Sequence, residues 1–415
     1  MGRFWLNTSA QHHAASLIAI SLSLLTPPTS AFAQPYADND PDQSGICLGR
    51  TLITPKLTAS TLLNDNIYLA ESSPKSDLIT MISPRIGIES DWPMFNLSLA
   101  AGAELGFFAK SSADDYQDLD LTAAGDLTIG DATLKGSLDW QRAHDPRGGN
   151  DVPTGAEEPV IYHDITTRLG GRYVTDFLRY ETQVSLHRLE FDDSKTTSGT
   201  VILNDDRDRL EMRETLRLLA PVDPKREAYG EVTLNQRQYD RVPDDTGRVR
   251  DSSGYQFYGG LRFDLTNVIS ADFAAGWMSQ TYSDQSFGDI DDYTLRANTE
   301  WAITRLTTIN LDVARTIRET TVVDSSGVLA FDIGASVAHE LRRGLDIGLS
   351  AGHIREQFKQ INRHDDISRL GANLSYELNR FTRIDAAINH DRRSSNSAGH
   401  DYRRLQTQIS LKLEM

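Results

Sequence analysis

Residues 253–282, SGYQFYGGLRFDLTNVISADFAAGWMSQTY, contain two runs in which apolar and polar side chains alternate. Because side chains two positions apart lie on the same face of a strand, each run predicts a strand with one apolar and one polar face. Each run is about ten residues long, the length with which a tilted strand crosses a bilayer. Aromatic residues stand near both ends of the apolar face, with Tyr255 and Trp277 at one end and Phe263 at the other. This is the placement expected of side chains at a membrane interface.

The same alternation recurs along the chain, for example in the pair of runs at residues 165–173 and 180–186. Tyr255, Tyr293 and Phe331 follow one another at equal intervals and mark equivalent ends of successive units. Tight turns alternate with long polar loops. A soluble sandwich shows similar strands but does not separate its connections by length in this way. Transmembrane barrels do, because they have short periplasmic turns and longer external loops.

We therefore predict an all-β fold, an antiparallel transmembrane β-barrel formed by residues 51–415. It has about 18 strands, with about 16 as the nearest alternative. Residues 1–33 have the basic residue, the short apolar segment and the small-residue cleavage site of a secretory signal peptide. Residues 34–50 are expected to form a periplasmic N-terminal segment. The expected location is the bacterial outer membrane.

The composition excludes several classes of protein. The chain has 415 residues, 24% of them charged, and a formal net charge of −17. This acidic balance argues against a nucleic-acid partner, which would require a basic face. Cys47 is the only cysteine, so a disulfide framework within the chain is impossible.

The final residues carry a further signal. Ile409, Leu411 and Leu413 alternate with polar residues up to Met415. Bacterial barrels commonly end in such a strand with a terminal aromatic residue that the barrel-assembly machinery recognises, and Met415 replaces that aromatic here. The expected partners are therefore outer-membrane lipid and the assembly machinery.

Several short motifs resemble the "putative β-barrel porin 2" group of outer-membrane proteins. They are LNDNI at residues 63–67, the tract from Tyr239-Asp240-Arg241 to Tyr282-Ser283-Asp284, and DYRR at residues 401–404. The resemblance covers most of the chain after the signal and implies a porin. Some members of the group are similar to proteins linked with export of surface polysaccharide, so polysaccharide export components are further expected partners.

The polar faces of the strands predict a water-filled lumen, because a barrel of this size is wide enough for a channel and small residues such as Gly260 and Gly334 leave its wall unfilled. Charges of both signs on that wall predict weak ion selectivity, with a preference for cations. The expected channel-lining residues are Arg168, Arg172, Arg217, Arg262, Asp264, Arg296, Glu300, Asp312, Asp332, Asp346, Arg369, Glu377 and Asp385.

Two other classes of function stay open. A non-conducting surface barrel, either an adhesin or a structural protein, would carry its function in its loops. An outer-membrane hydrolase would need a constellation such as His390-Asp391 near Ser394 and Ser395. No motif marks a nucleophile there, and His364-Asp365-Asp366 lacks the second pair of ligands that a metal site needs. We therefore expect no enzymatic activity, no cofactor and no metal.

Overall fold

A computed structural model shows a closed antiparallel β-barrel of 18 long strands, which confirms the predicted fold. The structure describes residues 45–149, 152, 155–266 and 268–415. The expected signal peptide, residues 1–33, lies outside the described residues, as does most of the expected periplasmic segment. Consecutive long strands pair with each other, and β2 closes the barrel by pairing with β21.

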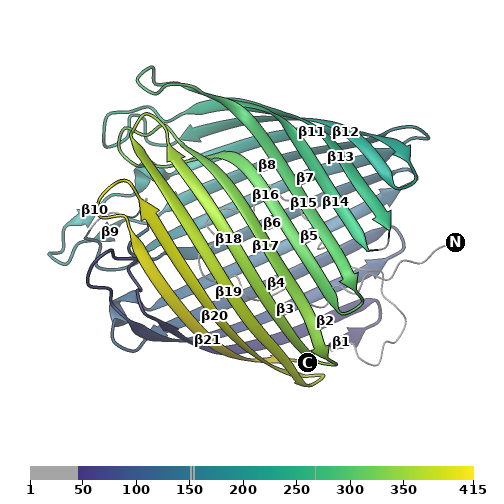
Figure 1. Ribbon diagram of the computed structural model, residues 1–415, viewed down its shortest axis with the longest axis horizontal. Helices are drawn as coiled ribbons and strands as arrows, with labels where there is room; N and C mark the ends of the chain where they lie inside the picture. The colour runs from purple at the N-terminus through teal and green to yellow at the C-terminus, as the bar shows by residue number, and fades with distance from the viewer. Residues whose placement is uncertain (1–44, 150–151, 153–154, 267) are drawn as a thin grey trace.

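The strands run obliquely around the barrel, with the long loops at one end and the tight turns at the other (Figure 1). The long strands are β2 (Thr51–Asn64), β3 (Asp77–Trp92), β4 (Phe95–Phe108), β5 (Tyr116–Ile129), β6 (Ala132–Asp145), β7 (Val160–Val174), β8 (Arg179–Phe191), β11 (Arg209–Asp223), β12 (Arg226–Tyr239), β13 (Ser252–Thr266), β14 (Ile269–Tyr282), β15 (Ile290–Thr304), β16 (Thr307–Arg318), β17 (Val328–Arg342), β18 (Leu345–Phe358), β19 (Arg363–Asn379), β20 (Thr382–Ser395) and β21 (Tyr402–Glu414). The short elements are β1 (Ile46–Leu48), β9 (Ser194–Lys195), β10 (Val201–Ile202) and two 3-10 turns, η1 (Ser112–Asp114) and η2 (Asp205–Arg207).

The strands are longer than the apolar alternation alone indicates. The run at residues 165–173 lies within β7, which begins at Val160 and ends at Val174. Backbone pairing continues where the apolar–polar alternation stops, since ladder hydrogen bonds do not depend on which side chains the strands carry. The barrel wall therefore extends past the apolar band towards the loops.

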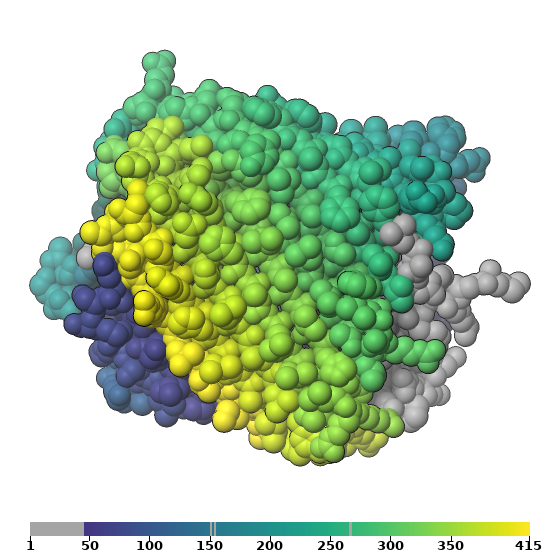
Figure 2. Space-filling view, in the orientation of Figure 1, coloured from purple at the N-terminus to yellow at the C-terminus, as the bar shows by residue number. Residues whose placement is uncertain are grey.

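The register of β13 and β14 shows how the two faces arise. Phe257 pairs with Trp277 and Leu261 with Phe273, so four large apolar side chains lie on one face. Their exposed fractions are 48%, 42%, 46% and 45%, respectively. The opposite face is concave, because side chains on it bond across intervening strands, as between Glu231 on β12 and Arg296 on β15. The exposed apolar face is therefore the convex outer face of the barrel. Figure 2 shows the part of this outer face that the C-terminal strands form.

The apolar alternation in the sequence predicts nine lipid-facing positions, and all of them follow this register and lie on the outer face. They are Phe257, Leu261, Phe273, Leu295, Ile309, Leu311, Ile333, Leu349 and Leu374.

The turns at the end opposite the long loops are tight, and glycine permits two of them. Gly130, between β5 and β6, has φ 58°, and Gly344, between β17 and β18, has φ 72°. Glycine adopts this left-handed conformation without the steric penalty that a Cβ atom brings. Short turns of this kind identify the periplasmic end of a barrel, so the long loops lie at the external end.

Candidate channel wall

Every residue expected to line a channel lies on the concave face. The ladder registers place Arg168, Arg172, Arg217, Arg262, Asp264, Arg296, Glu300, Asp312, Asp332, Asp346, Arg369, Glu377 and Asp385 on the face opposite the exposed apolar side chains. They are spread around the barrel from β7 to β20 and do not form one compact site. Their role in conduction remains a prediction.

Many of these side chains are held in ion pairs with neighbours on the wall. Arg168 lies 2.6 Å from Asp139, Asp332 lies 2.7 Å from Arg318, and Asp385 lies 2.8 Å from Lys412. Sequence reasoning placed such residues on the correct face but could not tell which were neutralised. The pairing depends on cross-strand register, and the order of residues along one strand does not reveal it.

The sector formed by β11–β15 contains a cluster of enclosed charges at mid-height, and we call its concave face the packed wall. At its centre is Glu231, which is 4% exposed. Arg217 Nε donates to Glu231 Oε2 at 2.6 Å, and Arg296 Nη2 donates to the same oxygen at 3.1 Å. Both arginines are 6% exposed. A carboxylate enclosed between two guanidinium groups has the hydrogen-bond partners that a buried charge needs.

Glycine makes this cluster possible. Arg296 reaches Glu231 across β13 and β14, where small residues leave the wall free. On β13, a Cβ atom at Gly260 would lie 2.2 Å from Tyr229 Cζ. The Tyr229 ring therefore lies over the glycine, and its hydroxyl donates to Asp272 and accepts from Arg296 Nη2 at 3.2 Å. The ring packs with Leu219, Tyr258 and Ala274.

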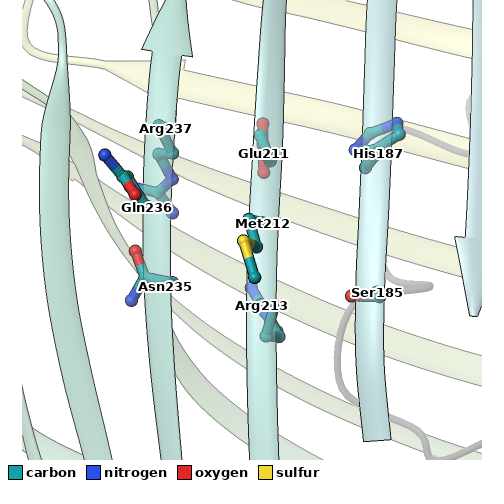
Figure 3. A pocket seen from close by; sticks show the side chains of 8 residues that line it. All are labelled: Ser185, His187, Glu211, Met212, Arg213, Asn235, Gln236 and Arg237. Atoms are coloured by element: carbon teal, nitrogen blue, oxygen red, sulfur yellow. The ribbon is translucent and has the colours of Figure 1, made fainter. Parts of the chain in front are cut away.

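A second group of buried charges stands on the packed wall nearer the external end. Arg237, on β12, bonds to Glu319, which follows β16, and Glu319 also accepts from the Tyr239 hydroxyl at 2.8 Å. Glu211, on β11, accepts from Arg209 Nε at 2.8 Å. Figure 3 shows the small pocket beside this group, whose lining residues are carried by three adjacent strands, β8, β11 and β12. The lining residues are Ser185, His187, Glu211, Met212, Arg213, Asn235, Gln236 and Arg237.

The concave face of β17–β20 differs in character, and we call it the open wall. Its middle carries small or neutral polar side chains: Gly334, Ser336, Gly348, Ser350, Gly352, Gly371, Asn373, Ser375 and Asn389. Ser350 and Asn373 are exposed. No atom lies within 4 Å of a Cβ built on Gly334. This part of the wall therefore borders unfilled space.

The external loops are joined to each other around the rim. Arg147 Nε donates to Asp114 at 2.6 Å, linking the loop after β6 to the loop after β4. Arg250, in the loop after β12, donates to Asp244 at 2.7 Å and to the carbonyl of Thr320 at 2.9 Å. The Arg147–Asp114 and Arg250–Thr320 bonds cross between different loops, so they fix the outline of the external mouth.

The loop carboxylates have shifted proton affinities. Burial acts to raise the pKa of Asp244, but the N–H of Arg248, the Thr246 hydroxyl and the Arg250 guanidinium together hold it below its usual range. In contrast, burial raises the pKa of Asp208 to about 6 against the opposing effect of the Phe191 N–H. Asp208 lies just before β11, at the external end of the packed wall.

The His390 and Asp391 side chains that a hydrolase would need are not brought together. His390 and Asp391 are consecutive on β20 and therefore point to opposite faces of the wall. His390 pairs with Leu405 on the outer face, whereas Asp391 accepts from Arg404 Nε at 3.1 Å on the concave face. The same alternation separates Asp365 from its neighbours His364 and Asp366.

No group of three or more His, Cys, Asp or Glu side chains within the described residues is arranged to hold a metal ion. No helix in that part of the chain has the length and apolar character needed to cross a membrane.

A closed barrel with an apolar outer face and a polar concave face defines the chain as a porin-like outer-membrane β-barrel. Residues 40–415 match the model of the family described as "Putative beta-barrel porin 2", and the chain belongs to this family. The resemblance seen in the sequence is thereby confirmed. The family description is that of a porin and names no enzymatic activity.

Solved structures with a similar fold include outer-membrane proteins of Pseudomonas aeruginosa. The outer membrane protein OpdK has 11% identity and a TM-score of 0.46, with 88% of this chain and 99% of that chain covered. OpdO has 12% identity and a TM-score of 0.45, covering 88% and 97%. The ferric enterobactin receptor PfeA has 8% identity and a TM-score of 0.47, covering 88% and 81%. Among curated proteins, none matches the chain.

Proposed function

We propose that the protein is a passive channel for hydrophilic solutes through the bacterial outer membrane. The observation that carries this proposal is the exposure of charged side chains on the concave face. Asp264, Glu300 and Asp312 all face inward and are all exposed. An ionised carboxylate inside a closed barrel remains solvated only if the interior holds water, because its transfer to an apolar interior costs several kcal/mol.

The same residues support a preference for cations. Among the described residues, four channel-lining carboxylates form no ion pair, and they outnumber the two channel-lining arginines that form none, Arg172 and Arg369. The four carboxylates belong to Asp264, Glu300, Asp312 and Asp346. Arg217 and Arg296 share Glu231. Carboxylates that line a pore without a cationic partner attract cations and repel anions. The preference should be weak, because these groups are spread over several strands of a wide lumen.

Ion conductance in planar bilayers tests the proposal directly. The purified protein should give open channels, and the reversal potential in a salt gradient should indicate cation selectivity. Replacing Glu300 and Asp312 by Gln and Asn should move that potential towards zero. The matched control is Glu214→Gln, because Glu214 lies on the outer face of β11 and should not affect selectivity.

A silent barrel would overturn the channel and favour a non-conducting surface barrel, with its function in the external loops. A clear preference for anions would overturn the selectivity alone. These two outcomes are distinguishable because the first is measured as conductance and the second as the sign of a potential.

Export of surface polysaccharide is the second candidate for the transported material. The hydroxyl and amide groups of Ser336, Ser350, Asn373 and Asn389 on the open wall favour it, because they match the hydrogen-bonding groups of sugars. Liposome swelling with neutral oligosaccharides of increasing length distinguishes it from a channel for small ions. Permeation should persist for long linear sugars, and exclusion of all but the shortest sugars would argue against export.

A further inference from the structure

Arginines gather on the outer face of the barrel at the external ends of β18–β21. Arg355, Arg392 and Arg403 are all exposed there. The register places Arg392 directly opposite Arg403, and Ser368 pairs with Arg392 on its other side. Arg355 lies opposite Asp366 on the neighbouring pair of strands. We call these three residues the arginine patch.

The patch lies just beyond the apolar band. On β20, Ile388 is on the same face as Arg392 and is 46% exposed. On β21, Leu405 is on the same face as Arg403 and is 41% exposed. One further step along each strand leads to the external loop at residues 396–401. The arginines are therefore at the level of the lipid headgroups of the outer leaflet, on the face seen in Figure 2.

The patch is not neutralised by the protein. Among the described residues, Arg355, Arg392 and Arg403 make no side-chain ion pair. The neighbouring carboxylates are engaged elsewhere, since Asp366 lies 3.4 Å from His353 Nε2 and Asp65 accepts the Leu405 N–H at 2.7 Å. Like charges placed directly opposite each other on a sheet destabilise the pairing. Arg392 and Arg403 therefore repel each other until an anion binds between them.

Another arginine on the outer face shows that this arrangement is not general. Arg188, at the external end of β8, donates to Asp240 at 2.8 Å and to Glu190 at 3.0 Å. Its charge is satisfied within the protein. The chain as a whole carries a net charge of −17, so an unneutralised cationic surface stands against the overall balance.

A hollow beside the patch extends the surface. It is lined by Tyr293, Arg315, Leu329, Phe331, Arg355 and Gln357. The Arg315 guanidinium lies 3.7 Å from the centre of the Tyr293 ring and pairs with Asp292 at 2.6 Å, which leaves Arg355 as the available cation. Its aromatic and apolar lining offers contact for a sugar ring or an acyl chain next to a cation.

We propose that the arginine patch binds the phosphate groups of a phosphorylated glycolipid in the outer leaflet. The chemistry requires a ligand with at least one phosphate dianion at headgroup level and an apolar portion that remains in the bilayer. Guanidinium groups bind phosphate through paired N–H donors, and two adjacent arginines match one phosphate. Because this surface is on the outside of the barrel, the proposal does not depend on whether the lumen conducts.

The test uses the full-length protein in nanodiscs. The discs are made of phosphatidylcholine and contain lipopolysaccharide. In them, the wild-type protein should bind more glycolipid per barrel than the double variant Arg392→Gln/Arg403→Gln. Each basic residue near an anionic surface contributes roughly a fivefold gain in affinity, so the double variant should bind about 25-fold more weakly. Arg392→Lys/Arg403→Lys should retain most of the binding, and Arg188→Gln should match wild type.

A second measurement needs no variant. Wild-type protein should bind lipopolysaccharide and fail to retain the same glycolipid after enzymatic removal of its phosphates. Equal binding of the two forms, or undiminished binding by a folded double glutamine variant, would overturn the proposal. Inorganic phosphate that occupies the patch as tightly as the lipid would show a free-phosphate site and would also overturn it.

Discussion

The packed wall and the open wall face the same lumen but are built on different principles. The packed wall encloses Glu231 between two arginines and covers them with the Tyr229 ring. The open wall has small residues, with vacant space around Gly334. In both walls, apolar and polar residues alternate along the strands. The outward-facing apolar side chains hold the barrel in the membrane, and the inward-facing side chains can therefore differ between the two walls. One sector can therefore supply rigidity while the other leaves room for solute.

The largest effect is expected from removing the central carboxylate of the packed wall. Glu231→Leu leaves Arg217 and Arg296 enclosed without their shared partner, which should destabilise the barrel by about 3–5 kcal/mol. Urea unfolding of the detergent-refolded protein measures the change. Glu300→Leu is the control, because Glu300 is exposed and should change stability by less than about 1 kcal/mol. Both carboxylates lie on the packed wall, so similar losses for the two variants would show that enclosure between two arginines adds nothing to the contribution of Glu231.

The outer faces of the two sectors should respond alike. Leu261→Arg, behind the packed wall, and Leu349→Arg, behind the open wall, each place a charge in the lipid and should cost about 2–4 kcal/mol. Both variants should assemble poorly, as measured by heat-modifiable migration on gels. Arg262→Leu, one residue from Leu261 but on the concave face, should assemble normally. Equal tolerance of Leu261→Arg and Arg262→Leu would show that the two faces are wrongly assigned.

A smaller effect should distinguish two glycines on the concave face. Gly260→Ala places a Cβ atom 2.2 Å from Tyr229 Cζ, so the ring must move and weaken its bonds to Asp272 and Arg296. Overpacking of this kind costs about 1–3 kcal/mol. Gly334→Ala meets no atom within 4 Å and should be neutral or slightly stabilising. Unfolding curves of the two variants test the contrast, and a neutral Gly260→Ala would contradict the role of the glycine.

The smallest effect concerns pH at the external ends of the two sectors. Burial raises the folded-state pKa of Asp208 to about 6, above its unfolded value. Protonation of Asp208 therefore favours the folded loop, and this stability is lost as pH rises through about 6. Burial, with the charges of Arg363 and Arg393, lowers the pKa of His400, which lies in the loop before β21. The neutral imidazole therefore favours the folded loop, and this stability is lost as the pH falls below the ordinary pKa of histidine.

Changing the pH from 7 to 5 should therefore raise the hydrogen-exchange protection factor, which is corrected for the intrinsic pH dependence of amide exchange, in the loop before β11 and lower it in the loop before β21. Both groups are partly solvated, so the changes should be about two- to fivefold. Asp208→Asn should abolish the first change and leave the second in place. Parallel changes in the two loops would show that a global effect of pH dominates.

The comparison also explains what the sequence could predict. Alternation of apolar and polar residues is local, so the face of each residue from Arg168 to Asp385 follows from its position in a strand. The bond between Arg296 and Glu231 is not local, because it depends on the register of β12–β15 and on the absence of a side chain at Gly260. The bonds between loops, such as Arg250 to the Thr320 carbonyl, have no periodic signal at all. The pairing of β1 with β2 was missed for a similar reason, since β1 is too short to show a period.

The closure of the barrel has a consequence for how the protein is made. The β2–β21 ladder runs from Lys56, opposite Glu414, to Asn64, opposite Gln406. On the concave side, the Ser60 hydroxyl donates a hydrogen bond of 2.9 Å to the Ser410 hydroxyl. These residues are at opposite ends of the chain, so this seam forms only after every other hairpin has been synthesised. Until then both edge strands present unpaired N–H and C=O groups that lipid cannot satisfy. The backbone groups of both edge strands are therefore satisfied only when β2 pairs with β21.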